Sequence, residues 1–149
     1  MKAEAVETET GIYGLFGKYR PLSNFHLEDF IFEGRKYRCS EAAYMSCKTI
    51  DIDEKMNLTV MDGPTAKKYG QTIQLVKNWN VIRVSMMTNV LREKFKQSKS
   101  LMDLLVQTDK KYIEETNWWN DRFWGVCEGT GENNLGKILM SIRDNRDWT

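Results

Sequence analysis

The sequence is poor in the residues that bind metals or form disulfides. It contains one histidine, His26, and three cysteines, Cys39, Cys47 and Cys127. No two of these cysteines are spaced as CxxC, and an odd number of scattered thiols argues against both a zinc site and a disulfide framework. We therefore expect a chain that uses no metal and no cofactor, in a reducing, cytoplasmic compartment.

Long hydrophobic runs and an excess of one charge are also absent. No apolar run is long enough to cross a membrane, and residues 1–10 lack the apolar segment of a signal peptide. The 22 basic and 21 acidic side chains give a net charge of +1, which argues against a general nucleic-acid coat or a polybasic membrane binder. A local basic pocket for a few phosphates is still compatible with this balance.

What is present is the composition of an ordinary globular domain. The chain has 149 residues, 41% of them hydrophobic and 29% charged, which is enough to bury one core. We expect a disordered leader over residues 1–10, followed by a single α+β domain over residues 11–149 that is mostly helical with a small β-sheet.

The expected strands are short. Residues 12–16 and 112–115 have the apolar character of strands, and residues 30–32 and 35–37 flank Glu33-Gly34 as in a tight hairpin. Residues 51–62 are acidic and polar, and we expect them to be irregular, as we do the Trp-, Asn- and Gly-rich segment 116–134.

The expected helices follow from end signals and periodicity. Ser40 is the predicted N-cap of a helix that carries Glu41 and Lys48. Further helices are predicted from Pro64 to about Gly70, over residues 79–97, after a capping box of Ser100 and Asp103, and from Leu135 onward. The helix over residues 79–97 has two neighbouring apolar stripes, which predicts that it is largely buried.

Glu41 and Lys48 are separated by seven residues, nearly two helical turns. On one helix they would project from the same face. A carboxylate beside an amine can carry out proton transfer or imine chemistry. The same spacing also occurs on ordinary charged helix faces, so it does not by itself indicate a site.

Three loops contain residues suited to a nucleotide ligand. Ser23 and Asn24 are suitable for ribose or phosphate binding, or simply for bonding to the local backbone. The tryptophans at 118, 119 and 124 can stack on a base or form a structural cluster. Gly131 precedes the last helix, where free backbone amides can receive an anion, although glycine also marks ordinary loops.

In this order, these segments resemble the NADAR (YbiA-like) family, from about Ile12 to Arg143. The matching positions are Pro21-Leu22-Ser23-Asn24-Phe25, Gly34–Tyr37, Ser40-Glu41, Tyr44, Lys48, Pro64, Ala66-Lys67, Gly70, Trp79, Met86 or Met87, Lys94-Phe95, Leu104–Thr108, Glu115, Asp121, Trp124-Gly125, Gly131, Asn133, Leu135-Gly136, Leu139-Met140 and Arg143. The chain departs from the family pattern at three places. Ala42 stands where the family often has His, Asp109 stands where it commonly has Gly, and the interval between Glu115 and Asp121 is longer than usual. The last two departures bear on substrate preference more than on fold.

The resemblance implies an N-glycosidase that cuts a ribosyl C1′–N bond, with a lysine-linked Schiff base on the sugar as a family expectation. It implies catalytic roles for Glu41, Lys48 and Asp121. The residues implied in substrate binding are Ser23, Asn24, Tyr44, Trp79, Glu115, Trp124, Gly131 and Asn133. Glu41 is the first choice for proton transfer to the base. Because the helix dipole favours the charged form of a carboxylate in the first turn, a role as base or an electrostatic role is also open.

The resemblance implies two alternative N-glycosidase activities, and a third function, of another class, is also open. The first is removal of ADP-ribose from guanine in nucleic acid, which would make a modified nucleic acid the partner. The second is cleavage of small ribosylamino-pyrimidine phosphates of the riboflavin pathway. The third is non-catalytic binding of ADP-ribose or a nucleotide. The presence of both Glu41 and Lys48 favours an enzyme, because a binding module needs neither group.

Overall fold

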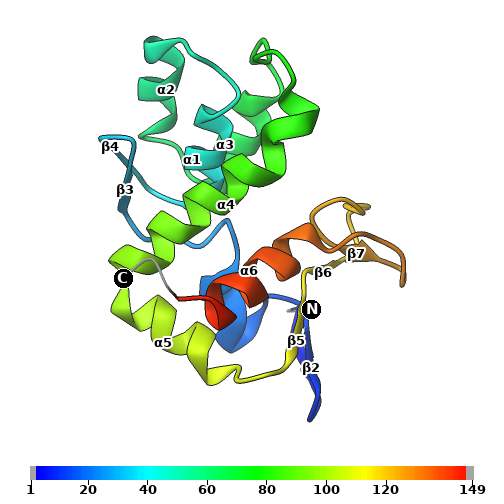
Figure 1. The fold of residues 1–149 in the computed structure, drawn as a ribbon. Coiled ribbons are helices and arrows are strands. Elements are labelled where there is room, and N and C mark those ends of the chain that lie inside the picture. Colours follow the sequence, from blue (N-terminus) through cyan, green and yellow to red (C-terminus); the bar gives the residue numbers. More distant parts are fainter. Residues whose placement is uncertain (1–2, 147–149) are drawn as a thin grey trace. The chain divides into compact units, whose positions relative to one another are not determined.

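The computed structural model describes residues 3–146, which form an α+β protein of two compact units. Unit 1 is built from residues 1–23 and 98–149, and unit 2 from the continuous segment 24–97. Residues 1–2 of the expected leader, and residues 147–149 of the expected domain, lie outside the described part. Figure 1 shows the helices and short strands of both units.

Unit 1 contains a three-stranded sheet in the order β1-β2-β5. The central strand β2 (Gly11–Tyr13) pairs antiparallel with β1 (Val6–Glu7) and parallel with β5 (Tyr112–Glu114). Ile12 and Ile113 lie opposite each other in this register, and both are fully buried. The prediction of disorder over residues 1–10 is wrong at β1, because backbone pairing with β2 orders this polar segment.

The helical part of unit 1 consists of the 3-10 helix η1 (Gly17–Leu22), α5 (Lys99–Gln107) and α6 (Asn134–Asp144). Helix α6 packs on β5 through an apolar face, as its sequence periodicity predicts. Helix α5 begins two residues earlier than predicted, because Ser98 rather than Ser100 is the N-cap and accepts a hydrogen bond from Leu101 N at 3.3 Å. The segment expected to be one loop contains two paired strands, β6 (Thr116–Asn117) and β7 (Val126–Cys127).

Unit 2 contains one hairpin and four helices. The hairpin of β3 (Phe30–Phe32) and β4 (Arg35–Tyr37) turns at Glu33 and Gly34, whose φ angles of 50° and 78° are those of a tight type I′ turn. Helix α1 (Ser40–Ser46) packs against α2 (Ile52–Leu58), α3 (Gly63–Gly70) and α4 (Trp79–Gln97).

Two predictions for unit 2 are corrected. The expected irregular segment contains α2, because the Asp51 side chain accepts hydrogen bonds from Asp53 N at 2.8 Å and Glu54 N at 3.4 Å and so caps a helix. Helix α4 has the predicted bounds, but only its second half is largely buried, and Val84 of the predicted stripe is 37% exposed.

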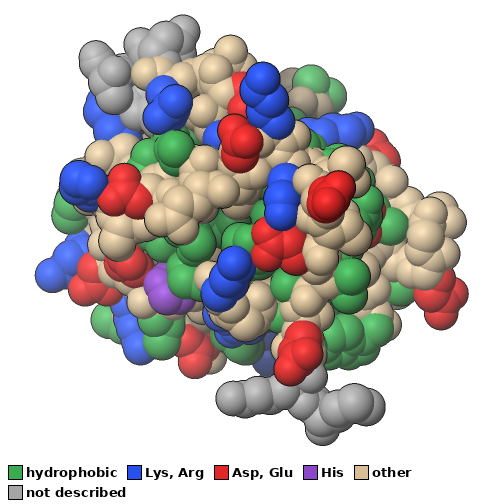
Figure 2. Space-filling view, turned by 90° about the horizontal axis from the view of Figure 1, so that it is seen from below, with side chains coloured by type: hydrophobic (Ala, Val, Ile, Leu, Met, Phe, Trp, Pro, Cys, Tyr) green, Lys and Arg blue, Asp and Glu red, His purple; other side chains and the backbone are tan. Residues whose placement is uncertain are grey.

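The surface carries both signs of charge. Acidic and basic side chains are interspersed with apolar ones on the face shown in Figure 2, as the near-zero net charge leads one to expect. No helix in the described part of the chain is long and apolar enough to span a bilayer.

Candidate functional site

Glu41 lies in the first turn of α1, and its side chain is almost wholly buried, with 8% of the residue exposed. Its backbone N–H donates to the Asn24 carbonyl at 3.0 Å, which ties the start of the helix to the segment before β3. The N-cap position is occupied by Cys39 rather than by the predicted Ser40, which is the first helical residue.

Lys48 lies just beyond α1, not within it as predicted. The helix ends at Ser46, and the chain continues in a tighter turn, in which Lys48 N donates to the Met45 carbonyl at 3.1 Å. The Lys48 side chain folds back toward α3, and its Nζ donates to the Gly70 carbonyl at 3.3 Å.

Glu41 and Lys48 are electrostatically coupled despite this difference. Burial lowers the pKa of the Lys48 amine, and the charge of Glu41 opposes that shift. Unit 2 therefore brings the predicted carboxylate and amine into one electrostatic environment, in which a larger share of the lysine is neutral than in water.

An aromatic pair lies next to these groups along α1. The ring of Tyr44 contacts that of Trp79, the first residue of α4, with centroids 5.3 Å apart and planes tilted by 40°. Both residues are buried, so they form part of the core of unit 2.

Asn24 forms hydrogen bonds within unit 2. Its Oδ1 accepts a hydrogen bond from Ser40 Oγ at 2.8 Å, and its Nδ2 lies 3.6 Å from Met87 Sδ. Ser40 in turn accepts from Lys94 Nζ at 3.3 Å. The sequence predicted Ser40 as an N-cap and Lys94 only as a position that matches the family, and it placed neither in the site. The available signal was a lysine on the apolar face that contains Val90 and Leu91.

In unit 1, Asp121 organises the tryptophan-rich loop. Its Oδ1 accepts hydrogen bonds from Phe123 N at 3.1 Å and Trp124 N at 2.9 Å. Asn117 stabilises the same turn, because its Nδ2 donates to the Asp121 carbonyl at 2.8 Å. Asp121 thus has the loop-capping role that short polar side chains often have, in addition to any role in chemistry.

Glu115 and Asn133 lie together in unit 1. Asn133 Oδ1 accepts from Glu115 N at 3.0 Å, and its Nδ2 donates to the Ile113 carbonyl at 2.9 Å. Glu115 Oε2 accepts from Asn117 Nδ2 at 3.1 Å, and the Cα of Gly125 faces Glu115 so closely that no side chain fits there. Asn133 is buried with a φ of 55°, so its amide joins α6 to β5 rather than pointing outward.

The other predicted residues of unit 1 are less enclosed. Trp124 is half-buried against Phe123. Gly131 is exposed, with a φ of 155° that favours glycine. Ser23 is half-buried at the end of η1, where its N–H donates to the Arg20 carbonyl at 2.9 Å.

The predicted residues therefore form two groups, one in each unit. Unit 2 holds Asn24, Glu41, Tyr44, Lys48 and Trp79, and unit 1 holds Ser23, Glu115, Asp121, Trp124, Gly131 and Asn133. Within residues 3–146 no cluster of three or more His, Cys, Asp or Glu side chains is arranged to hold a metal ion. The chemistry offered by the first group is that of a carboxylate and an amine.

Most of the chain is similar to known proteins. The NADAR domain family matches residues 13–145. The chain is 30% identical to the N-glycosidase YbiA of Escherichia coli K12, over 93% of this chain and 88% of that protein. It is 25% identical to an N-glycosidase of Nostoc punctiforme, over 89% and 85% of the two chains.

A longer relative and a solved structure extend this comparison. A riboflavin biosynthesis protein of Vibrio vulnificus is 33% identical over 83% of this chain, which spans only 34% of that protein. The solution NMR structure of E. coli YbiA superposes with a TM-score of 0.80 at 28% identity, covering 93% of this chain and 86% of the other. The chain belongs to the NADAR family.

Proposed function

We propose that this chain is an N-glycosidase that hydrolyses a ribosyl C1′–N bond, and that it removes ADP-ribose from ADP-ribosylated guanine in nucleic acid. The observation that carries the proposal is the buried Glu41 carboxylate coupled to Lys48, an amine whose pKa is lowered. The names of the E. coli and Nostoc relatives, both N-glycosidases, support the reaction class.

Glu41 serves proton transfer in this proposal. Breaking the C1′–N bond leaves positive charge on the sugar and negative charge on the departing base. A carboxylate can activate the attacking water, and its protonated form can deliver a proton to the base. Attachment of the Glu41 backbone to Asn24 fixes the start of the helix and so limits where the carboxylate can reach.

Lys48 serves as the nucleophile. Its neutral amine bonds to C1′ while the C1′–N bond to the base breaks, and the base takes the electron pair and a proton. Loss of the amine proton and opening of the ribose ring, whose O4′ becomes a hydroxyl, give an imine between C1′ and Nζ. Water then adds to C1′ and releases the sugar aldehyde and the free amine. The lowered pKa of Lys48 supplies the neutral form that the first step needs.

The preference for nucleic acid rests on exposed aromatic rings in unit 1. Trp118 is 68% exposed and stacks on Phe16 with centroids 5.5 Å apart, and Trp119 meets Trp118 edge-on at 4.9 Å. Exposed aromatic faces are suited to stacking on unpaired bases. A nucleic acid offers unpaired bases for such stacking in addition to the modified guanine, whereas a free mononucleotide offers none.

A second candidate is cleavage of ribosylamino-pyrimidine phosphates. It is favoured by one observation, the name of the Vibrio relative as a riboflavin biosynthesis protein. Both candidates share the ribosyl C1′–N bond and the roles of Glu41 and Lys48.

We further propose a cytoplasmic protein without a membrane partner, in keeping with the three free thiols at Cys39, Cys47 and Cys127.

A release assay tests the proposal. An oligonucleotide carrying ADP-ribosylated guanine and a ribosylamino-pyrimidine phosphate are each offered to the wild type, Glu41→Gln and Lys48→Ala. We expect release from the oligonucleotide by the wild type and loss in both variants. Cleavage of only the pyrimidine substrate selects the second candidate. Tight ADP-ribose binding without cleavage of either substrate identifies a binding module, and activity unaffected by both substitutions overturns the site.

A further inference from the structure

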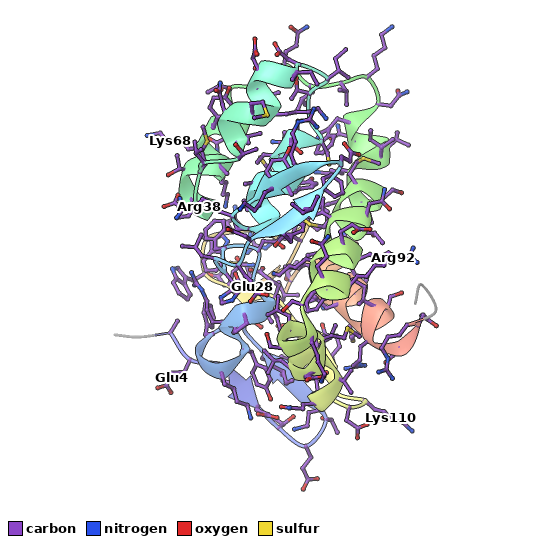
Figure 3. All side chains as sticks on the ribbon, turned by 90° about the vertical axis from the view of Figure 1, so that its left-hand side faces the viewer. Glu4, Glu28, Arg38, Lys68, Arg92 and Lys110 are labelled. Atoms are coloured by element: carbon purple, nitrogen blue, oxygen red, sulfur yellow. The ribbon has the colours of Figure 1, made fainter. Side chains whose placement is uncertain are left out.

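Lys94 is the most deeply buried charged side chain among the described residues of unit 2. It lies on α4 with 2% of its surface exposed, on the same helix face as Val90 and Leu91. Arg92, two residues earlier, extends away from the helix into solvent in Figure 3. Burying an amine among apolar side chains costs free energy, and a methionine of similar length would fill this space without that cost. Packing alone therefore does not explain a lysine here.

A chain of hydrogen bonds leads from Lys94 to Glu41. Lys94 Nζ donates to Ser40 Oγ at 3.3 Å, and Ser40 Oγ donates to Asn24 Oδ1 at 2.8 Å. The carbonyl of the same Asn24 accepts the Glu41 N–H at 3.0 Å. Together the links connect three segments: α4, the first turn of α1, and the segment before β3.

The charges around Lys94 show that it shares its surroundings with the start of α1. Burial lowers the pKa of Lys94 to about 8, while Cys39 and Glu28 act in the opposite direction. Burial raises the pKa of the Cys39 thiol, the charge of Glu41 raises it further and that of Lys94 lowers it, so the three groups lie within one electrostatic environment. Glu28, labelled in Figure 3, precedes β3, and its backbone N–H donates to the Arg38 carbonyl at 2.9 Å.

We propose that Lys94 is a positioning residue for Glu41. Through Ser40 and Asn24 it holds the first turn of α1 in the place from which the Glu41 carboxylate acts. This inference rests on the proposed role of Glu41 in C1′–N bond cleavage, and it assigns Lys94 no contact with the reacting atoms.

Three variants test the inference. Lys94→Met removes the donor at nearly constant volume, and Ser40→Ala removes the middle link while keeping the lysine. Val90→Ala is the matched control, because Val90 is fully buried on the same helix but makes none of these hydrogen bonds. The first measurement is amide hydrogen exchange at Glu41, which needs no substrate. We expect faster exchange there in Lys94→Met and Ser40→Ala, measured relative to global unfolding, and not in Val90→Ala.

The second measurement is turnover of whichever N-glycosyl substrate the wild type cleaves. We expect kcat to fall about 10- to 100-fold in Lys94→Met and Ser40→Ala, with KM within about threefold of wild type, since misplacement of a catalytic group affects mainly the chemical step. The variant that combines Glu41→Gln with Lys94→Met should be no slower than Glu41→Gln alone, because the two residues act as one unit.

The outcomes separate this inference from the proposed function. A wild type that cleaves no N-glycosyl substrate, with faster exchange at Glu41 in the two variants, overturns the function but leaves the positioning contact in place. An active wild type whose Lys94→Met and Ser40→Ala variants behave like Val90→Ala overturns the inference alone. If Lys94→Met does not fold, Ser40→Ala decides, because it retains the buried lysine. Multiplying effects of Glu41→Gln and Lys94→Met would show that Lys94 acts independently of Glu41.

Discussion

The carboxylate of Glu41 raises the pKa of the Lys48 amine, in opposition to the burial that lowers it. Burial and the charge of Glu41 together determine what fraction of Lys48 is protonated. Since an amine must be neutral to attack a carbon, the balance between these two effects controls how much nucleophile is available.

Replacing Glu41 with glutamine should lower the pKa of Lys48 further, because the substitution removes the negative charge and leaves the burial. NMR titration of 15N-labelled lysine side chains measures this directly, with the Lys48 signal assigned by its loss in Lys48→Arg. The midpoint should move to lower pH in Glu41→Gln. A midpoint that stays in place or rises would show that the two groups are not coupled as described.

Borohydride reduction during turnover should trap a covalent sugar adduct on Lys48. The yield should rise with pH as the amine loses its proton, with a midpoint below the ordinary lysine value of 10.5. Peptide mass spectrometry locates the adduct, and Lys48→Arg, which keeps the charge but not the nucleophile, is the control. Active turnover without any adduct would assign Lys48 a purely electrostatic role.

Lys94 should make the stability of the protein depend on pH in a defined window. Its pKa is about 8 in the folded state and near 10.5 in the unfolded chain, so between these values the unfolded chain binds more protons and stability rises with pH. Relative to Lys94→Met, the unfolding free energy of the wild type should increase by about 3 kcal/mol from pH 8 to 10.5. Urea denaturation of both proteins at several pH values measures the difference, and parallel curves would contradict the lowered pKa of Lys94.

Asp121 offers a way to separate loop capping from chemistry. Asp121→Asn keeps an oxygen that accepts from Phe123 N and Trp124 N, so stability should change by less than about 0.5 kcal/mol. Asp121→Ala should lose about 1 kcal/mol, the usual value of a capping side chain. We expect the asparagine variant to lose at least about tenfold in kcat through its missing charge. Full activity in Asp121→Asn would reduce Asp121 to a structural residue.

Trp118→Ala tests the preference for nucleic acid. Because Trp118 is largely exposed, the substitution should cost only about 1 kcal/mol of stability through the lost stacking on Phe16. It should reduce kcat/KM on a modified oligonucleotide by about 5- to 100-fold, the worth of one base-stacking contact, and leave a modified mononucleotide unaffected. Equal effects on both substrates would contradict stacking on a neighbouring base.

Local sequence signals predicted those elements that local interactions determine. The bounds of α4 followed from its periodicity, and the β3–β4 turn from Glu33-Gly34, whose backbone has positive φ angles. Helix α2 was missed although Asp51 is a standard capping residue, because the acidic composition of the segment outweighed that signal. Strand β1 depends on pairing with β2, which short-range patterns do not reveal.

The candidate site shows the same division. The seven-residue spacing indicated Glu41 and Lys48 as a pair. In the structure the two are coupled electrostatically, although Lys48 lies outside the helix. The link from Lys94 to Ser40 joins positions 54 residues apart, so only tertiary packing reveals it. The engagement of Asn133 with the Ile113 carbonyl likewise depends on how α6 packs on β5.

The parallel pairing of β2 with β5 has a consequence for how the chain folds during synthesis. Strand β2 is made early, but its partner at residues 112–114 leaves the ribosome only after all of segment 24–97 has emerged. Unit 2, which is continuous in sequence, has every residue it needs by then, whereas unit 1 must wait to close its sheet around a long loop. The part of the protein that holds Glu41 and Lys48 is therefore available to fold before β2 can pair with β5.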